Sequence, residues 1–230
     1  IGGLGFNGIT AAFANAAAIG GTVCGIFNQG TTTLTAAGSN RTISGNTIGG
    51  NGIANSMRSG NALNAGFTTT ANFSVVGILN TGSTRMNILN NTVQNLSVPT
   101  RSSAGVVYGI HTTTGINTIS GNTVHTLTSN AKNVGATTAA HLAGISHTST
   151  TAPVAGTEVN IAQNTVRNLK INSDSSLVIV NGISYTGSTT TGFNYLIQRN
   201  NIYDIGDLTL TASDTAKVTY NGIGLFGGIA

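Results

Sequence analysis

Residues 117–127 read NTISGNTVHTL, and two closely similar stretches flank them: NILNNTVQNL at 87–96 and NIAQNTVRNL at 160–169. Aligned, they share the pattern Ile-x-x-Asn-x-(Val/Ile), which the chain repeats at intervals of 31 to 45 residues. Its asparagines are Asn46, Asn91, Asn122, Asn164 and Asn200. Repetition that tolerates uneven spacing is typical of a solenoid, in which loops of variable length join equivalent coils.

A second phrase, Gly-Ile, alternates with the first along the chain. An apolar residue or a tyrosine stands two positions before each glycine. The glycines are Gly25, Gly77, Gly109, Gly144, Gly182 and Gly222. The apolar residues on either side, at positions −2 and +1, cannot both face the core of a regular strand. We therefore expect a bulge or bend at each glycine.

The two phrases predict strands rather than helices. Their apolar residues are largely β-branched, glycine interrupts the chain about every ten residues, and no long 3.6-residue periodicity survives. The prediction is an all-β, single-domain parallel β-helix, or β-solenoid, of about five to six coils with variable loops. It spans 1–230, with less regular coils in 1–60 and regular repeats in 70–230. Copies of Asn-Gly-Ile at 7–9 and 51–53 suggest further partial coils near the N-terminus.

The repeated asparagine has a physical role in such a stack. We expect it at the turn between two strands, where asparagine tolerates a left-handed backbone. Coils stacked about 4.8 Å apart would also let its side chain hydrogen-bond from coil to coil as a ladder. The Val/Ile of the phrase is expected to point inward. The next position is expected to face solvent, and it holds Gln94, His125, Arg167 and Tyr203.

The stretches SGNTVHTLTS, QNTVRNL, VVYGI and IVNGISYTGS carry a resemblance to a known group of proteins. The chain resembles the right-handed parallel β-helix and, more specifically, the Asn/Thr/Gly-rich β-strand-repeat proteins that Bacteroidetes-type bacteria secrete to their surface. The resemblance covers nearly all of the chain from about residue 20. It implies an extracellular or cell-surface location and a structural or adhesive role.

Composition excludes several classes of function. Only 6% of residues are charged, against roughly 25% in an ordinary globular protein. The net charge of +4 comes from scattered residues, without a basic cluster or an RNA-binding aromatic motif, so no nucleic-acid partner is expected. No apolar stretch approaches the length of a membrane-spanning helix. The single cysteine, Cys24, excludes a disulfide framework and is expected to be a structural or partly exposed thiol.

The few residues capable of chemistry do not form a convincing site. Glycan-cleaving β-helices gather carboxylates from neighbouring coils, whereas Asp204 and Asp207 come from one coil. Asp204 replaces an asparagine of the repeat, so we expect a turn residue. His111 and His147 would be neighbours one register apart, but without a third ligand they are expected to be solvated loop residues, as are His125 and His141. We predict no catalytic residue, cofactor or metal.

Function is therefore expected to lie in the solenoid itself. Open strand edges at its ends would recruit other chains. The prediction is a non-enzymatic, extracellular structural protein that assembles end to end into a filament or surface layer, as a homo-polymer or with segments of a longer solenoid. The alternatives are an adhesin passenger and a carbohydrate-binding or carbohydrate-cleaving β-helix. The carbohydrate alternative predicts an exposed aromatic groove, for which Tyr185, Tyr195 and Tyr203 are the candidates.

Overall fold

The computed structural model describes most of the repeat phrases. The described residues are 21–29, 41–54, 56–59, 68–69, 73–82, 85–99, 101–102, 105–130, 141–148, 158–172, 178–187, 194–207 and 218–226. Within these ranges the regular structure consists of strands, without a helix. Residues 1–20, where a partial first coil is expected, lie outside them.

The strands form three parallel sheets, which we call A, B and C. Sheet A contains β1 (Gly21–Asn28), β6 (Phe73–Asn80), β10 (Val106–Thr112), β13 (Leu142–Thr148), β16 (Ile179–Thr186) and β19 (Thr219–Phe226). Sheet B contains β2 (Arg41–Ser44), β7 (Met86–Leu89), β11 (Asn117–Ser120), β14 (Glu158–Ala162) and β17 (Asn194–Gln198). Sheet C contains β3 (Thr47–Ile48), β8 (Thr92–Val98), β12 (Thr123–Ser129), β15 (Thr165–Ile171) and β18 (Asn201–Asp207).

Three short strands lie outside these regular runs. β4 (Met57–Arg58) pairs with β8, and β5 (Thr68–Thr69) pairs with β9 (Arg101–Ser102) in a separate small sheet.

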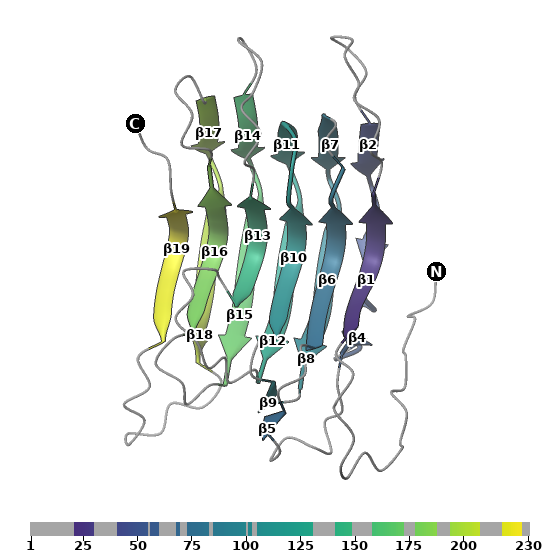
Figure 1. Ribbon diagram of the computed structural model, residues 1–230, viewed down its shortest axis with the longest axis vertical. Coiled ribbons are helices and arrows are strands. Elements are labelled where there is room, and N and C mark those ends of the chain that lie inside the picture. The colour runs from purple at the N-terminus through teal and green to yellow at the C-terminus, as the bar shows by residue number, and fades with distance from the viewer. Residues whose placement is uncertain are drawn as a thin grey trace.

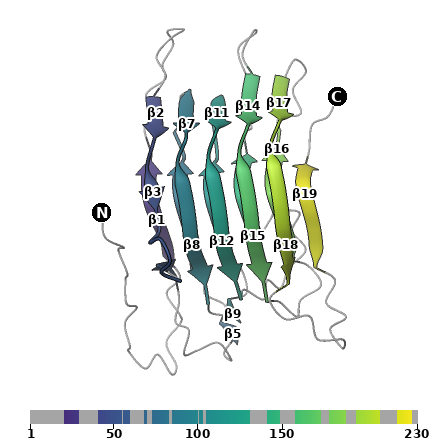
Figure 2. The ribbon, with the colours of Figure 1, turned by 180° about the vertical axis from the view of Figure 1, so that it is seen from behind.

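The chain visits sheets A, B and C in turn, and each visit to all three makes one coil. Figure 1 shows sheet A in front with the sheet B strands beyond its ends, and Figure 2 shows sheet C from behind. Every strand pair between adjacent coils is parallel. The described residues thus form five complete coils followed by β19, which confirms the predicted parallel β-solenoid of five to six coils.

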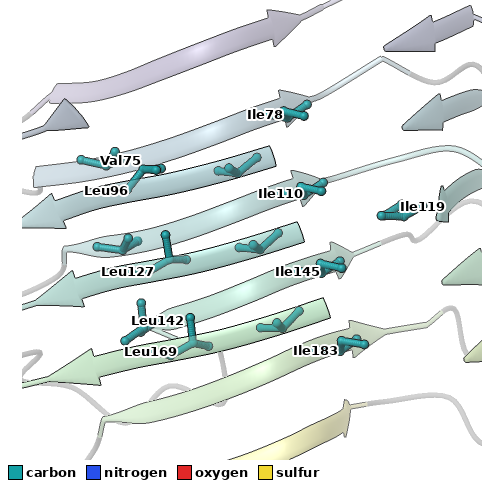
Figure 3. Packing of buried hydrophobic residues seen from close by; sticks show 14 of the residues in the cluster. Val75, Ile78, Leu96, Ile110, Ile119, Leu127, Leu142, Ile145, Leu169 and Ile183 are labelled. Carbon is teal, nitrogen blue, oxygen red and sulfur yellow. The ribbon is translucent and has the colours of Figure 1, made fainter. Parts of the chain in front are cut away.

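The register places equivalent residues of successive coils directly above one another. In sheet A, the isoleucines after the repeated glycines form one column: Ile26, Ile78, Ile110, Ile145, Ile183 and Ile223. In sheet C, Leu96, Leu127 and Leu169 form another column, which lies across the core from the sheet A residues at the start of the Gly-Ile phrase, among them Val75 and Leu142. Figure 3 shows these side chains filling the space between the sheets. The inner members of both columns are fully buried.

The asparagine phrase forms the corner between sheets B and C in each coil. β7 ends at Leu89 and β8 begins at Thr92, so the corner occupies only two residues, and the other coils repeat this arrangement. The strand–turn–strand interpretation of the phrase is therefore confirmed. The Val/Ile of the phrase points inward: Val93, Val124 and Val166 have no exposed surface.

The outward position after that valine differs from expectation in one coil. Tyr203 is exposed and His125 and Arg167 are half-buried, but Gln94 is buried. The first coil explains this difference, because its sheet C strand is interrupted between β3 and β4. Gln94 Nε2 donates a hydrogen bond to the carbonyl oxygen of Gly49 in that interruption. The Asn-Gly-Ile copy at 51–53 lies in the same interruption, as a turn, and does not start a coil.

Candidate functional site

The repeated asparagines form a continuous hydrogen-bonded ladder at the corner between sheets B and C. Asn46 Nδ2 donates to Asn91 Oδ1 at 2.9 Å. The next three rungs measure 3.0 Å each and join Asn91 to Asn122, Asn122 to Asn164 and Asn164 to Asn200. In each rung the backbone N–H of the earlier asparagine donates to the same oxygen. The ladder thus satisfies the polar groups of a buried corner and aligns the coils.

The four ladder asparagines after Asn46 also reach back to the preceding coil. Asn122 Nδ2 donates to the carbonyl oxygen of Ile88 at 2.8 Å, and Asn164 Nδ2 donates to that of Ile119 at 2.9 Å. These isoleucines lie in the sheet B strands, one residue before each strand ends, so the asparagine amide supplies a donor from the next coil beside the corner.

The left-handed backbone at this corner lies one residue before the ladder asparagine. Positive φ angles occur at Gly45, Asn90, Gly121, Gln163 and Arg199. The expectation that the ladder asparagine itself adopts this conformation is wrong. Its backbone N–H and side chain must point along the stack to form the rungs, so the preceding residue makes the turn.

A second set of left-handed residues lies within the sheet C strands. Asn95, Thr126, Asn168 and Asp204 have φ angles between 53° and 58° and occupy equivalent positions. Pairing is interrupted at this position in every coil, but the register on both sides stays one residue against one, so the sheet C strands share a bend and not a bulge. Asp204 therefore lies at a bend within β18 and not in a turn between strands.

The repeated glycines are required by close approach. A Cβ atom at Gly109 would lie 2.3 Å from Val124 Cγ1 and 2.5 Å from the carbonyl oxygen of Gly144 in the next coil. Pairing in sheet A is interrupted at this position, and the apolar residues on both sides, Val107 and Ile110, are fully buried. Gly77, Gly144 and Gly182 are equally crowded, whereas a Cβ at Gly222 would meet nothing within 4 Å.

A largely buried polar column, which was not predicted from the sequence, lies three residues after each of the first five repeated glycines. It contains Asn28, Asn80, Thr112, His147 and Tyr185. Asn28 Nδ2 donates to Asn80 Oδ1 at 2.6 Å, and Asn80 Nδ2 donates to Asn117 Oδ1 at 3.2 Å. Aligning the sequence on Gly-Ile reveals this column, but the mixed residue types conceal it.

His147 is the titratable centre of this column. Its Nδ1 lies 2.6 Å from Thr112 Oγ1, and its ring stacks on Tyr185 at a centroid distance of 5.3 Å. Its Nε2 is buried and has no hydrogen-bond partner in the described part of the chain. Burial, reinforced by nearby His111, lowers the pKa of His147 to about 3. The imidazole is thus held neutral inside the core.

The expectation of solvated loop histidines is wrong. His111 and His147 lie in β10 and β13, one register apart, with His111 beside Ser146 on the opposite face of the sheet from His147. His141 is buried immediately before β13, and His125 is half-buried in β12. Burial lowers the pKa of both His111 and His141 to about 4. In the paired columns of sheet A, His111 stands where neighbouring coils have Leu or Ser, and His147 stands where a neighbouring coil has Tyr.

The acidic residues do not gather into a site in the described part of the chain. Asp204 is half-exposed and forms an ion pair with Lys170 at 2.5 Å, and Glu158 is exposed on β14. Asp174 and Asp214 lie outside the described residues. Within the described ranges, no three His, Cys, Asp or Glu side chains are grouped so as to hold a metal ion.

Cys24 and the aromatic candidates occupy different environments. Cys24 is half-buried, and burial raises the pKa of its thiol. Tyr185 is buried in the core beside half-buried Tyr195, with ring centroids 4.6 Å apart, whereas Tyr203 is exposed. These three tyrosines therefore do not line one exposed groove.

The two ends of the stack expose residues that are buried everywhere else. In the sheet A isoleucine column, the four inner residues are completely buried. Ile26 is half-buried at one end, and Ile223 is 46% exposed at the other. Tyr220 and Leu225 of β19 are also exposed. Each end thus offers an apolar face and a strand edge that the next coil would cover inside the stack.

Comparison with protein-family models, with curated proteins and with solved structures finds no match. Among the described residues there is no helix of the length and apolarity that crossing a bilayer requires.

Proposed function

We propose that the protein is a non-enzymatic, extracellular structural component whose solenoids join end to end into a filament or surface layer. The observation that carries this proposal is the contrast within single columns. Ile183 is fully buried by its neighbours, while Ile223, one coil further, is 46% exposed. The isoleucine column thus breaks off at this end, and a joined solenoid would continue it.

The stabilisation available at each end is modest but repeated. Complete burial of an isoleucine side chain contributes about 1.5 to 3 kcal/mol, so covering the half-buried Ile26 of the second copy contributes up to about 1 kcal/mol. Strand pairing along the open edge and a new asparagine rung would add directional hydrogen bonds. Together these terms favour association without requiring a pocket or a catalytic group.

The low charge of the chain supports the same proposal. With 6% charged residues, the molecule has little electrostatic repulsion between copies. The carbohydrate alternative receives less support, because Tyr185 is buried and does not contribute to an exposed aromatic surface. The adhesin alternative is compatible with the same stack and differs in whether the solenoid is attached to a larger surface protein.

Electron microscopy and sedimentation velocity at micromolar protein concentration test the proposal. We expect filaments or sheets from the unmodified protein and short single rods from Ile26→Lys, because β1 lies in the junction and joining two solenoids would bury an unpaired ammonium group. Gln163→Lys adds the same charge at an exposed position in the middle of the stack and should assemble normally. Single rods from the unmodified protein at all concentrations would exclude end-to-end assembly, and glycan binding would then be measured.

A further inference from the structure

The two ends of the described stack differ by one strand: one end is a complete coil, and the other carries one additional strand in sheet A. Each complete coil adds a strand to sheets A, B and C in that order, and β19 follows the fifth coil in sheet A alone. Sheet A therefore reaches one level beyond β17 and β18, as the outermost position of β19 in Figure 1 shows. At the other end, β1, β2 and β3 all belong to the first coil.

The asparagine ladder gives the two ends opposite hydrogen-bonding character. In every rung the earlier coil donates through its backbone N–H and Nδ2, and the later coil accepts through Oδ1. In the described part of the chain, Asn46 Oδ1 has no donor and the backbone N–H of Asn200 has no acceptor. One end thus offers an acceptor and the other offers donors. Unlike ends are complementary and like ends are not, which favours head-to-tail contact.

A continued ladder determines where the next copy must lie. If Asn200 donates to Asn46 of a second copy, β2 and β3 of that copy lie on β17 and β18 at the usual strand spacing of about 4.8 Å. At this level sheet A has one position, beside β16. Both β19 and the second copy's β1 belong at that position, so one of them must leave.

Docking β1 above an intact β19 would avoid the conflict but open a gap elsewhere. Sheets B and C would each lack one strand at the junction, and about 10 Å would separate β17 from the second copy's β2. The facing N–H and C=O groups would lose their strand partners, and the ladder would be broken. Direct stacking is therefore the poorer arrangement.

Of the two competing strands, β19 is held more loosely. A Cβ atom at Gly25 would lie 2.5 Å from Ile48 Cγ2, so β1 packs closely on its own complete coil. The equivalent position in β19, Gly222, has nothing within 4 Å. Ile223 is 46% exposed, whereas Ile26 in β1 is half-buried. Strand β19 has no sheet B or sheet C strand of its own level beneath it in the described chain.

We infer that β19 is a displaceable strand that occupies the docking position of a second copy's β1. This inference rests on the proposed end-to-end assembly and specifies its partner, its polarity and its exchange step. Before contact, β19 covers the edge of β16. On contact, β1 of the second copy replaces it beside β16, the ladder continues from Asn200 to Asn46, and all three sheets run on without a gap.

The native Cys24 of β1 provides a direct test, because its sheet A column continues through Asn181 of β16 and Asn221 of β19. In Asn181→Cys, strand replacement places the second copy's Cys24 beside the new thiol, within the Cα separation of a disulfide. Within one copy the two positions lie four strand spacings apart, about 19 Å, and cannot be bridged. Asn181→Cys removes the hydrogen bond that Asn221 Nδ2 donates to Asn181 Oδ1 at 2.9 Å, and a substitution at Asn221 removes the same bond, so the two positions are matched in this respect.

The matched control is Asn221→Cys, which brings a thiol beside Cys24 only if β1 docks above an intact β19. Assembled samples of both variants are oxidised, separated without reductant, and analysed by mass spectrometry of linked peptides. We expect intermolecular linkage between Cys24 and position 181 in the first variant, and none between Cys24 and position 221 in the second.

The other outcomes overturn the inference in distinguishable ways. Linkage in Asn221→Cys alone would establish direct stacking, and assembly with linkage in neither variant would exclude continuation of this column. In both cases end-to-end assembly would stand. If the unmodified protein remains a single rod at all concentrations, the proposed function fails and the strand exchange fails with it.

Discussion

A pair of glycine substitutions tests whether close packing between coils requires the repeated glycine. Gly109 and Gly222 stand in the same phrase and the same column of sheet A. A Cβ atom at Gly109 would lie 2.3 Å from Val124 Cγ1 and 2.5 Å from the Gly144 carbonyl oxygen, whereas one at Gly222 would meet nothing. Both distances at Gly109 are below 3.0 Å, and the second involves backbone that two sheet partners hold in place.

The expected magnitudes follow from these distances. Overpacking of a core costs about 1 to 3 kcal/mol, and here a backbone atom must shift, so Gly109→Ala should cost at least about 2 kcal/mol. Alanine in an uncrowded strand stabilises by up to about 1 kcal/mol relative to glycine, so Gly222→Ala should be neutral or slightly stabilising. For a chain of this size, 2 kcal/mol corresponds to a decrease in Tm of about 4 to 8 °C.

Urea unfolding followed by circular dichroism, at protein concentrations below those that support assembly, measures both free energies of unfolding. The refuting result is an equal change for the two variants. In that case, the glycine would be required for a backbone conformation that all coils share. Lack of room for a side chain, which applies only to the covered coils, would not be the reason.

Three further predictions use the same unfolding assay. Asn122→Ala should cost about 2 to 4 kcal/mol, because it leaves the Asn91 donors and the Ile88 carbonyl without partners in a buried corner. Asn46→Ala, at the open end of the ladder, should cost less. Equal losses of stability in the two variants would contradict the ladder. Thr126→Asn should stabilise the fold by about 0.5 to 1 kcal/mol, because the β-branched Thr126 has a φ of 58° and asparagine occupies the equivalent position in both neighbouring coils. Destabilisation would show that the contacts of the Thr126 hydroxyl outweigh the strain of its left-handed backbone. Because the pKa of His147 falls to about 3 on folding, the unfolded chain binds the additional proton between pH 6.5 and 3. Stability present above pH 6.5 is therefore lost as the pH falls, by about 3 kcal/mol from this residue at pH 4.5. His147→Phe should lose less stability between pH 7 and 4.5 than the unmodified protein, while His111, His125 and His141, whose pKa values burial also lowers, contribute to the remainder. An unchanged pH profile would contradict the assignment.

The sequence by itself determined the fold class and the position of each corner. The repeats of Ile-x-x-Asn-x-(Val/Ile) and Gly-Ile are local patterns, and each coil rewrites them because each stacked level presents the same environment to the chain. Val93, Val124 and Val166 could be identified as core residues for this reason, since a position that is buried in one coil is buried in all covered coils. The order of the strands within a coil could also be read from the sequence, because the Gly-Ile phrase of sheet A alternates with the asparagine phrase of sheets B and C.

Only the tertiary structure decided which atoms meet between coils. Gln94 is buried because an interruption of the first coil covers it, although its counterparts Tyr203 and Arg167 face outward. His147 lies in the core because its position in sheet A turns inward three residues after the glycine, where the residue type varies from coil to coil. The direction of the ladder, the looseness of β19 and the open space at Gly222 likewise depend on which neighbours are present. A repeated sequence specifies the environment of an average coil, whereas the two ends differ from that average only through the contacts that they lack.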